Sequence, residues 1–517
     1  MAVTDAMRTH AALANIEELA AAPELLDAWS AHVGPHDPIT LVVVPGSWGP
    51  ERVQAQAPAL FARAGLDQGD ASPDVVVMTG PLEELDFIRL SGSCTAVYGA
   101  GPVPAQCAQL PRIGAQQLAE WTQACTPADV DDAPVDAADV RVTSERLGVN
   151  VIGYVSGSLG LGVAARATIA ALLNAGADVS VVDVSLGARS NADTSYHHLR
   201  VDNLQALPHA VNLIHYNPDA AAVLWERFPA WFAGGVNCIV PFWELVDLPP
   251  GWVAPLARYD VVLAPTAHIA AAVSRSVSVP VRRFPMAADV GHVPAIARSE
   301  FGIPEGKVAF ATSWDTNSGL ERKNGAGVVR AFAAALDFGA DAVLVIKLNG
   351  DVTDPLFLRE LARLPADRVV VISEYLPYRR VLGLYGACDA YISLHRAEGL
   401  GLGIQEAMQL GKPVIATGWS GNMDFMDEEC AAVVDFRLTP VVDGHPCYSP
   451  PQYPGGGHWA EPDLLVAARH IHRLAGDASA RAQLGEAARR RGLAYREQWL
   501  SAAPRQLATV SGALRRR

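Results

Sequence analysis

Residues 395–424 read HRAEGLGLGIQEAMQLGKPVIATGWSGNMD, and this stretch determines the fold class. It follows the strand-like run DAYISL, and its glycines at 399, 401 and 403 lead into a helical pattern over residues 404–410. A glycine-rich turn at a helix N-terminus presents free backbone N–H groups and partial positive charge, which suit a diphosphate. Glu398 and Glu406 flank this turn, so one carboxylate is predicted to meet a sugar and the other a ribose hydroxyl.

The chain around this stretch alternates short hydrophobic runs with alanine-rich helical patterns. Runs that are hydrophobic without alternation are typical of parallel strands buried on both faces by helices. One series of such strands is predicted at residues 149–156, 179–185, 211–217, 237–243 and 260–266, with a helix over 164–174. A second series is predicted at residues 307–314, 342–350, 368–374, 389–395 and 413–418, with a helix over 325–336. The sequence therefore predicts an α/β protein with two Rossmann-like halves, whose ligands bind beyond the carboxyl ends of the strands.

Composition excludes several classes of protein. Of the 517 residues, 50% are hydrophobic and 18% are charged, so the chain has enough apolar surface to fold. The net charge of −15 argues against nucleic acid as a partner. No window has the roughly 18 consecutive apolar residues of a transmembrane helix, and the N-terminus lacks a secretory pattern, so we expect a cytoplasmic protein. The seven cysteines form no CxxC pair, which predicts reduced thiols and no metal site.

A linker divides the chain. Residues 126–148 hold five aspartates and two prolines without an apolar period, as in an exposed connection. Length alone suggests about three domains. We expect an accessory α/β domain at 1–130, a linker at 131–148, an N-terminal, acceptor-side half at 149–295, a C-terminal nucleotide-sugar half at 296–500 and a basic tail at 501–517.

The accessory domain contains a stretch similar to the C-terminal half. Residues 74–99 align without gaps to residues 368–393, with eight of 26 positions identical. Either the accessory domain is a degenerate Rossmann-like copy of the nucleotide half, or two segments of similar architecture agree by chance. Residues 97–112 of this copy carry no acidic residue where Glu398 and Glu406 would stand.

The motif Glu398-GLGLGIQ-Glu406-AMQLGKPVIA resembles that of the retaining glycosyltransferases of the GT-B fold, in family 4 (glycosyl transferases group 1). The resemblance covers residues 149–500. It implies two Rossmann-like domains that face a cleft, and a donor that is a nucleotide diphosphate sugar. By this resemblance Glu398 is catalytic and contacts the donor sugar, and Gly399 binds the donor. Backbone N–H groups near Gly401 and Leu402 meet the diphosphate, and Glu406 binds the ribose. It implies no cofactor and no metal.

The family also uses a basic pair after the first strand of its C-terminal domain. Lys323 stands in the matching place of SWDTNSGLERKNG, with Arg322 beside it, but Ser318 occupies the position of the usual arginine. Both basic residues are therefore expected to bind the donor, and Lys323 is also expected to be catalytic. The base is expected near residues 374–377. His215, at the end of a central strand, is either a catalytic contact to the donor sugar or a buried structural histidine.

The segment GYVSGSLGLGVAAR carries a second glycine loop. The resemblance places Gly160 and Gly162 against an acceptor or a donor phosphate. The pattern Gly160-x-Gly162-x-x-Ala165, with Asp183 ending the next strand, also imitates a dinucleotide fingerprint, although four residues separate the strand from Gly160. Two further features stay open: Trp243 and Glu244 either line the acceptor site or pack in the core, and the loop at 440–459 is either a lid or a surface excursion.

These observations predict an enzyme that moves a hexose to a hydroxyl acceptor, with retention of anomeric configuration. The acceptor class stays open between a glycan, a lipid-linked acceptor or glycolipid, and a protein side chain. The alternatives are an NAD-dependent oxidoreductase and a catalytically silent scaffold. The N-terminal domain is expected to form homo-oligomers or to place the acceptor. The basic residues at 489–491 and 515–517 either end solvated helices or make peripheral contact with the inner face of a membrane.

Overall fold

The computed structural model describes most of the chain after residue 146 and separate segments before it. The described residues are 10–33, 39–44, 50–64, 66, 74–77, 96–98, 112–113, 115–118, 147–157, 159–184, 193–201, 206–316, 318–350, 354–442, 446–448 and 457–514. Contacts divide the chain into two compact units, Met1–Thr143 and Ser144–Arg517. The predicted linker at 131–148 lies outside the described residues up to residue 146.

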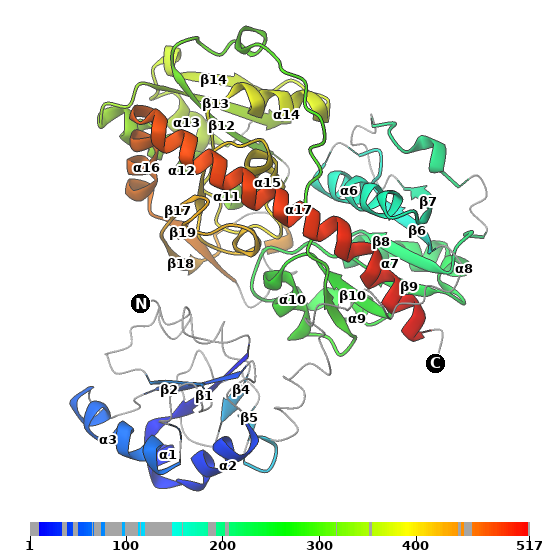
Figure 1. The fold of residues 1–517 in the computed structure, drawn as a ribbon, viewed down its shortest axis with the longest axis vertical. Helices are drawn as coiled ribbons and strands as arrows, with labels where there is room; N and C mark the ends of the chain where they lie inside the picture. Colours follow the sequence, from blue (N-terminus) through cyan, green and yellow to red (C-terminus); the bar gives the residue numbers. More distant parts are fainter. Residues whose placement is uncertain are drawn as a thin grey trace. The chain divides into compact units, whose positions relative to one another are not determined.

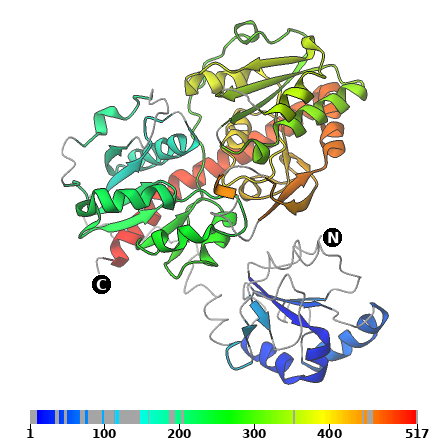
Figure 2. The same cartoon turned by 180° about the vertical axis from the view of Figure 1, so that it is seen from behind.

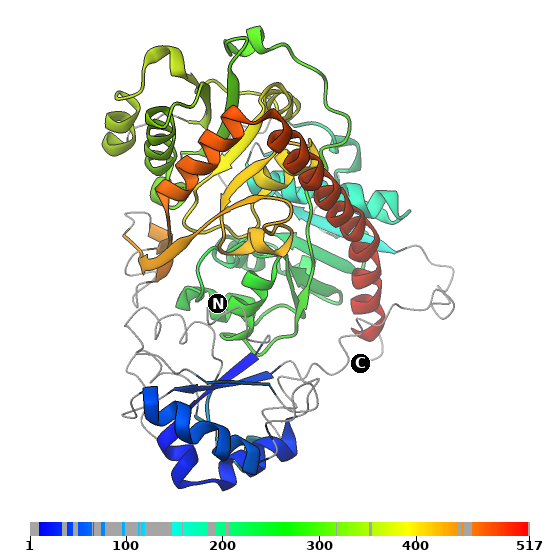
Figure 3. The same ribbon diagram turned by 60° about the vertical axis from the view of Figure 1, so that its left-hand side comes forward.

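The first unit contains a parallel sheet with the strand order β3-β2-β1-β4-β5. Its described elements are β1 (His10–Asn15), α1 (Ile16–Ala21), α2 (Glu24–His32), β2 (Ile39–Val44), α3 (Pro50–Arg63), β3 (Asp74–Val77), β4 (Ala96–Tyr98) and β5 (Arg112–Ile113). Asn15 ends β1 and caps α1, since its side chain accepts a hydrogen bond from the Glu17 N–H at 2.8 Å. The helices α1, α2 and α3 cover one face of the sheet (Figure 3), where Trp29 packs on Tyr98.

The proposed similarity between residues 74–99 and 368–393 includes two of these strands. β3 and β4 fall at the positions that match two strands of the C-terminal half, while residues 78–95 lie outside the described residues. The sheet order also matches the order of the first five strands in that half. Because this order is common to doubly wound sheets, an origin by duplication stays a prediction.

The second unit begins with a six-stranded parallel sheet in the order β11-β10-β9-β8-β6-β7. Its strands are β6 (Gly148–Gly153), β7 (Asp178–Asp183), β8 (Val211–His215), β9 (Val236–Ile239), β10 (Val261–Ala264) and β11 (Val281–Arg283). Its helices are α6 (Gly160–Asn174), α7 (Pro218–Arg227), α8 (Pro229–Phe232), α9 (Pro250–Leu256) and α10 (Ala267–Ser274). The central strands β8, β9 and β10 are buried at every position, which confirms the prediction from their unbroken hydrophobic runs.

A second six-stranded parallel sheet follows in the order β14-β13-β12-β15-β16-β17. Its strands are β12 (Val308–Asp315), β13 (Ala342–Asn349), β14 (Val369–Ile372), β15 (Ala390–Ser393), β16 (Val414–Thr417) and β17 (Ala432–Val434). Its helices are α11 (Leu320–Lys323), α12 (Gly325–Asp337), α13 (Pro355–Leu361), α14 (Tyr378–Ala387), α15 (Leu402–Gln409) and α16 (Leu464–Gly476). The strands β18 (Phe436–Pro440) and β19 (His458–Pro462) form an antiparallel pair beside it.

The last helix, α17 (Ala478–Leu514), runs from the C-terminal sheet to the N-terminal sheet (Figures 1 and 2). Residues 501–514, predicted as a basic tail, are the final turns of this helix. Trp499 on α17 is fully buried and packs edge-on against Phe284. One hydrophobic cluster includes α17 and both sheets, so the two halves share a core.

Hydrogen bonds also join the two halves directly. The Gln405 side chain accepts from the Ala288 N–H at 2.7 Å and donates to the Met286 carbonyl at 3.1 Å. The Thr266 hydroxyl donates to the Gly399 carbonyl at 2.9 Å. Thr266 and Gln405 are buried, so these bonds fix how the carboxyl ends of the two sheets face each other.

Candidate active site

A cavity of about 770 Å³ lies between the two halves, at the carboxyl ends of their strands. The N-terminal half contributes the start of α6 and the segments that follow β7, β8 and β9. The C-terminal half contributes the ends of β12 and β13 and the starts of α14 and α15. The predicted residues that line it are Gly160, Arg322, Lys323, Glu398, Gly399, Gly401, Leu402 and Glu406.

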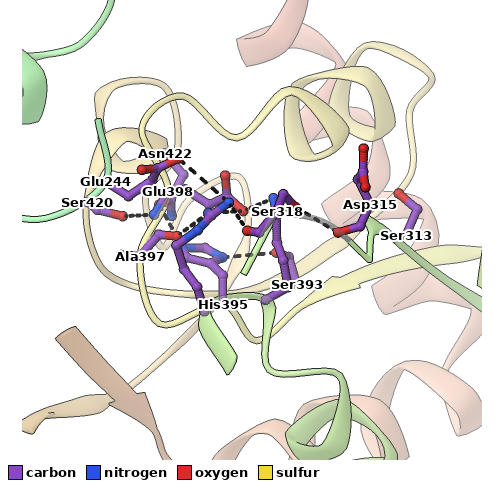
Figure 4. Close-up of polar contacts among 12 residues, drawn as sticks. Glu244, Ser313, Asp315, Ser318, Ser393, His395, Ala397, Glu398, Ser420 and Asn422 are labelled. Carbon is purple, nitrogen blue, oxygen red and sulfur yellow. Dashed lines mark hydrogen bonds and ion pairs between the residues drawn. The ribbon is translucent and has the colours of Figure 1, made fainter. Parts of the chain in front are cut away.

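Glu398 is the centre of an ionic network in this cavity (Figure 4). Its carboxylate pairs with the Lys323 ammonium and lies 3.5 Å from the Arg322 guanidinium. Burial would raise the pKa of Glu398, but the charges of Lys323 and Arg322 outweigh it and hold the pKa at about 2. Glu398 is therefore an acceptor of hydrogen bonds at neutral pH, with no proton to donate.

Hydrogen bonds fix the turn that carries Glu398. The Glu398 N–H donates to the Ser420 hydroxyl at 2.8 Å. His395 is fully buried, with one ring nitrogen 2.9 Å from the Ser393 hydroxyl and the other 3.0 Å from the Asn422 side-chain oxygen. These contacts, drawn in Figure 4, fix the backbone of the turn and hence the position of the carboxylate.

Asn324 orients the basic pair. It adopts a left-handed conformation with φ of 55°, which ends α11 directly after Lys323. Its side chain accepts from the Gly327 N–H at 3.1 Å and donates to the Leu394 carbonyl at 2.9 Å. The turn between α11 and α12 is therefore tied to the end of β15, which brings Lys323 to Glu398.

Arg322 points into protein more than into solvent, with a side chain that is 4% exposed. It donates to the Ala397 carbonyl at 2.8 Å and to the Ser318 carbonyl at 2.9 Å. Its guanidinium lies 3.6 Å from the Glu244 carboxylate of the N-terminal half, which accepts from the Tyr448 hydroxyl at 2.9 Å. Burial opposes the charge of Arg322, but these neighbours raise its pKa.

The N-terminus of α15 faces the cavity without a side-chain cap. Gly401 precedes the helix with φ of 83°, a conformation that side chains other than glycine rarely adopt. The backbone can therefore turn sharply from Glu398 into the helix. The N–H groups of the first turn and the helix dipole give this end of the cavity an affinity for anions.

Glu406, one turn into α15, has a different environment from Glu398. Its side chain is buried, lines the cavity and accepts a hydrogen bond from the Tyr378 hydroxyl at 2.8 Å. No cation pairs with it in the described part of the chain. Burial raises its pKa to about 7, and the bond from Tyr378 opposes the rise only in part. A ligand that donates hydrogen bonds would stabilise its charged form.

Two predicted residues do not line the cavity. Gly162 lies inside α6, where a Cβ atom would come within 2.3 Å of the Gly157 carbonyl oxygen, so it packs the helix onto the preceding loop. The His215 side chain is fully buried, and burial lowers its pKa to about 3. Neither ring nitrogen has a hydrogen-bond partner among the described residues. The structure thus places His215 among buried residues at the end of β8 and not in the lining of the cavity.

The dinucleotide alternative depends on Asp183, the last residue of β7. Its carboxylate accepts from the Ser156 hydroxyl at 2.6 Å and from the Ser156 N–H at 3.2 Å, and it pairs with Arg200. A dinucleotide site needs an acidic residue here that binds ribose hydroxyls. Because Asp183 already closes the β6–α6 loop, this geometry argues against the NAD interpretation.

Sequence reasoning missed several cavity residues that join segments far apart in the chain. Arg166 on α6 lies 3.2 Å from Asp193 and donates to the carbonyls of Val155 and Gly157. Tyr378 and Lys347 also line the cavity. Glu244, for which two roles stayed open, lines the cavity, whereas Trp243 is buried against Trp252 and Tyr448. The sequence signal that could have found these two residues was their position, with Lys347 near the end of a strand and Tyr378 at the start of a helix.

Two absences concern the described residues only. There, no group of three or more His, Cys, Asp or Glu side chains is arranged to hold a metal ion. No helix among those segments is both long and apolar enough to cross a membrane.

Comparison with known proteins settles the fold. Residues 317–436 match the family model of glycosyl transferases group 1. Sucrose-phosphate synthase from Thermosynechococcus elongatus superposes with a TM-score of 0.50 at 16% identity, over 71% of this chain and 99% of that one. Anabaena HepE in complex with UDP-glucose gives 0.51 at 14% identity, over 71% and 100%. The chain has the GT-B fold.

The GT-B region corresponds to the two sheets and α17 of the second unit, which confirms the predicted fold class. The family match covers the loop that follows β12 and the chain from α11 to β17. This part of the GT-B region contains Lys323, Glu398 and Glu406. No curated protein sequence matches the chain closely enough to count as a relative.

Proposed function

We propose that the protein is a retaining glycosyltransferase of family 4, which moves a hexose from a nucleotide diphosphate sugar to a hydroxyl acceptor. One observation carries this proposal: Glu398, paired with Lys323, and Glu406 flank the uncapped N-terminus of α15 in a single cavity. The match to glycosyl transferases group 1 over residues 317–436 and the GT-B fold support it. The UDP-glucose bound to the structurally similar Anabaena protein also favours a nucleotide sugar.

Each charged group suits one part of such a donor. The Glu398 carboxylate would accept hydrogen bonds from hydroxyls of the sugar, beside Gly399. Lys323 and the N–H groups at Gly401 and Leu402 would bind the diphosphate. Glu406 would accept hydrogen bonds from the ribose, and the segment at 375–377, which also lines the cavity, would face the base.

The reaction would depend on stabilising the leaving diphosphate. As the bond from the sugar to the phosphate oxygen breaks, negative charge grows on that oxygen. Lys323 and the α15 dipole would stabilise this charge. The acceptor hydroxyl would attack from the same face, and the departing phosphate oxygen would take its proton. Glu398, with its pKa near 2, would orient the sugar and transfer no proton.

The positive charges of Lys323 and of the α15 N-terminus would serve without a metal or a cofactor. The acceptor would approach from the N-terminal half, past Gly160 and Glu244, and would be a glycan, a lipid-linked acceptor or a protein side chain. We assign the first unit to homo-oligomerisation or acceptor placement. We further propose a cytoplasmic location, with peripheral membrane contact as an option for the arginine-rich C-terminus.

The variants Glu398→Ala and Lys323→Ala test this proposal. Removing a group that stabilises developing charge typically lowers kcat about 100- to 1000-fold, so transfer from the donor should fall by that factor in Lys323→Ala. Glu398→Ala removes the group that orients the sugar and should also lower transfer. Unchanged transfer in both would refute the site. A wild-type protein that binds donor but never releases nucleoside diphosphate would instead favour the silent scaffold.

A further inference from the structure

Lys347 is a buried cation in the cavity wall. It is the sixth residue of β13, only 4% exposed, and it lines the cavity at the carboxyl end of the sheet. Its ammonium group donates to the neighbouring Leu348 carbonyl and forms no ion pair with a described carboxylate. Burial lowers its pKa, and the more distant charges of Glu374 and Asp315 oppose this change only in part.

Three other cations that line the cavity differ from Lys347. Arg166 faces Asp193, Arg322 faces Glu244 and Glu398, and Lys323 pairs with Glu398. A buried charge without a counter-ion is costly, and proteins usually pair such a group or bind an anion with it. Among the described cavity residues, Lys347 is therefore the buried cation that forms no ion pair with a described carboxylate.

The segment beside Lys347 lacks a positive charge that the family resemblance implies. Lys347 lies directly beside Ser313 of β12, and the loop that follows β12 carries Ser318. Ser318 donates to the Asp315 carbonyl at 2.8 Å and brings no positive charge, although the sequence motif predicts an arginine at this position. Arg322 does not replace that arginine, because its two terminal nitrogens donate to backbone carbonyls and its charge is shared by two carboxylates.

We propose that Lys347 is a donor-binding residue that contacts the diphosphate and supplies the positive charge missing at position 318. This inference rests on the proposed function, since the diphosphate is the anionic part of a nucleotide sugar. Lys347, at the carboxyl end of β13, would then contact the diphosphate together with Lys323.

The variant Lys347→Met tests the inference, with Lys412→Met as a matched control. Lys412 also donates only to backbone carbonyls, those of Gly386 and Cys388, but it does not line the cavity. Calorimetry on the full chain would measure affinity for UDP, GDP, ADP and dTDP and for the corresponding nucleosides. For the base that the wild type prefers, Lys347→Met should weaken diphosphate binding about 10- to 100-fold and nucleoside binding less than about twofold.

The outcomes separate this inference from the proposed function. If the wild type binds none of these nucleotides, the proposed function fails and the inference falls with it. If the wild type binds and Lys347→Met keeps its affinity, only the inference is overturned. Equal losses for the nucleoside and the diphosphate would also overturn it, because they would place Lys347 at the base or ribose. Thermal unfolding without ligand should show Lys347→Met at least as stable as the wild type, which excludes misfolding as the cause.

Discussion

Donor binding should strengthen as the pH rises from about 6 to about 8, because Glu406 must lose a proton before it can bind ribose. Burial raises the pKa of its carboxyl group to about 7 in the free protein. Ribose hydroxyls that donate to the carboxylate favour its charged form, so the pKa falls in the complex and binding releases a proton. A protonated Glu406 carboxyl group can accept fewer hydrogen bonds from the ribose hydroxyls than the carboxylate can.

The expected size follows from the fraction of molecules with a charged Glu406. With a pKa of about 7, roughly one tenth are charged near pH 6 and roughly nine tenths near pH 8. The apparent dissociation constant scales inversely with the competent fraction, so it should fall about tenfold over this interval.

Titration calorimetry with an intact nucleotide sugar would measure this change, because its diphosphate is esterified at both ends and does not titrate near neutral pH. Glu406→Gln should abolish the pH dependence, and Glu300→Gln, a substitution at an exposed glutamate, should retain it. A wild-type affinity that stays constant, or that weakens toward pH 8, would refute the role given to Glu406.

The same ionisation affects stability in the free protein. In the unfolded chain the carboxyl group loses its proton near 4.5, whereas in the folded chain it keeps the proton up to about 7. The unfolded state therefore binds fewer protons, and the free energy of unfolding falls by about 3 kcal/mol as the pH rises through this interval. Denaturant titrations should show Glu406→Gln gaining stability over the wild type at pH 8 and gaining little at pH 5.

Three further predictions concern the supporting structure. Arg322→Met should lower the free energy of unfolding by about 3–5 kcal/mol in urea titrations, because it leaves Glu244 and Glu398 without this buried partner; a change below about 1 kcal/mol would contradict the network. Tyr448→Phe should cost about 1 kcal/mol in the same assay, the usual contribution of one hydrogen bond, and an unchanged midpoint would show that Tyr448 does not support Glu244. Deleting residues 1–143 should spare nucleotide binding while changing the oligomeric state or acceptor use; loss of binding by a folded remainder, measured by calorimetry and circular dichroism, would be inconsistent with that assignment.

The fold of the second unit was predictable because its strands are hydrophobic along their whole length. Strands β8 and β13, for example, lie within one or two residues of their predicted bounds. The helix predicted over 164–174 begins four residues earlier, at Gly160, because small residues and glycine hide the start of α6 in the sequence. The local hydrophobic pattern was therefore sufficient to predict strands whose burial is uniform along their length.

The site was predictable only where one short motif contains the chemistry. Glu398, Glu406 and the glycines between them lie within nine consecutive residues, so their shared place in the cavity followed from the sequence. Contacts between distant residues did not follow: Glu244 meets Arg322 across the two halves, and Tyr378 meets Glu406 across two helices. His215 shows the reverse case, since a strand end alone does not decide whether a side chain faces the ligand or the core.

Ligand-induced stabilisation tests the central claim most directly, since a ligand that binds only the folded state raises Tm. The full chain and its Lys323→Ala variant would be melted with UDP, GDP, ADP and dTDP sugars in turn. We predict that the wild type is stabilised by the sugars of one base and that Lys323→Ala loses this response. If no nucleotide sugar raises Tm, or if the Lys323→Ala variant responds as strongly as the wild type, the cavity at Glu398 and Lys323 is not a donor site.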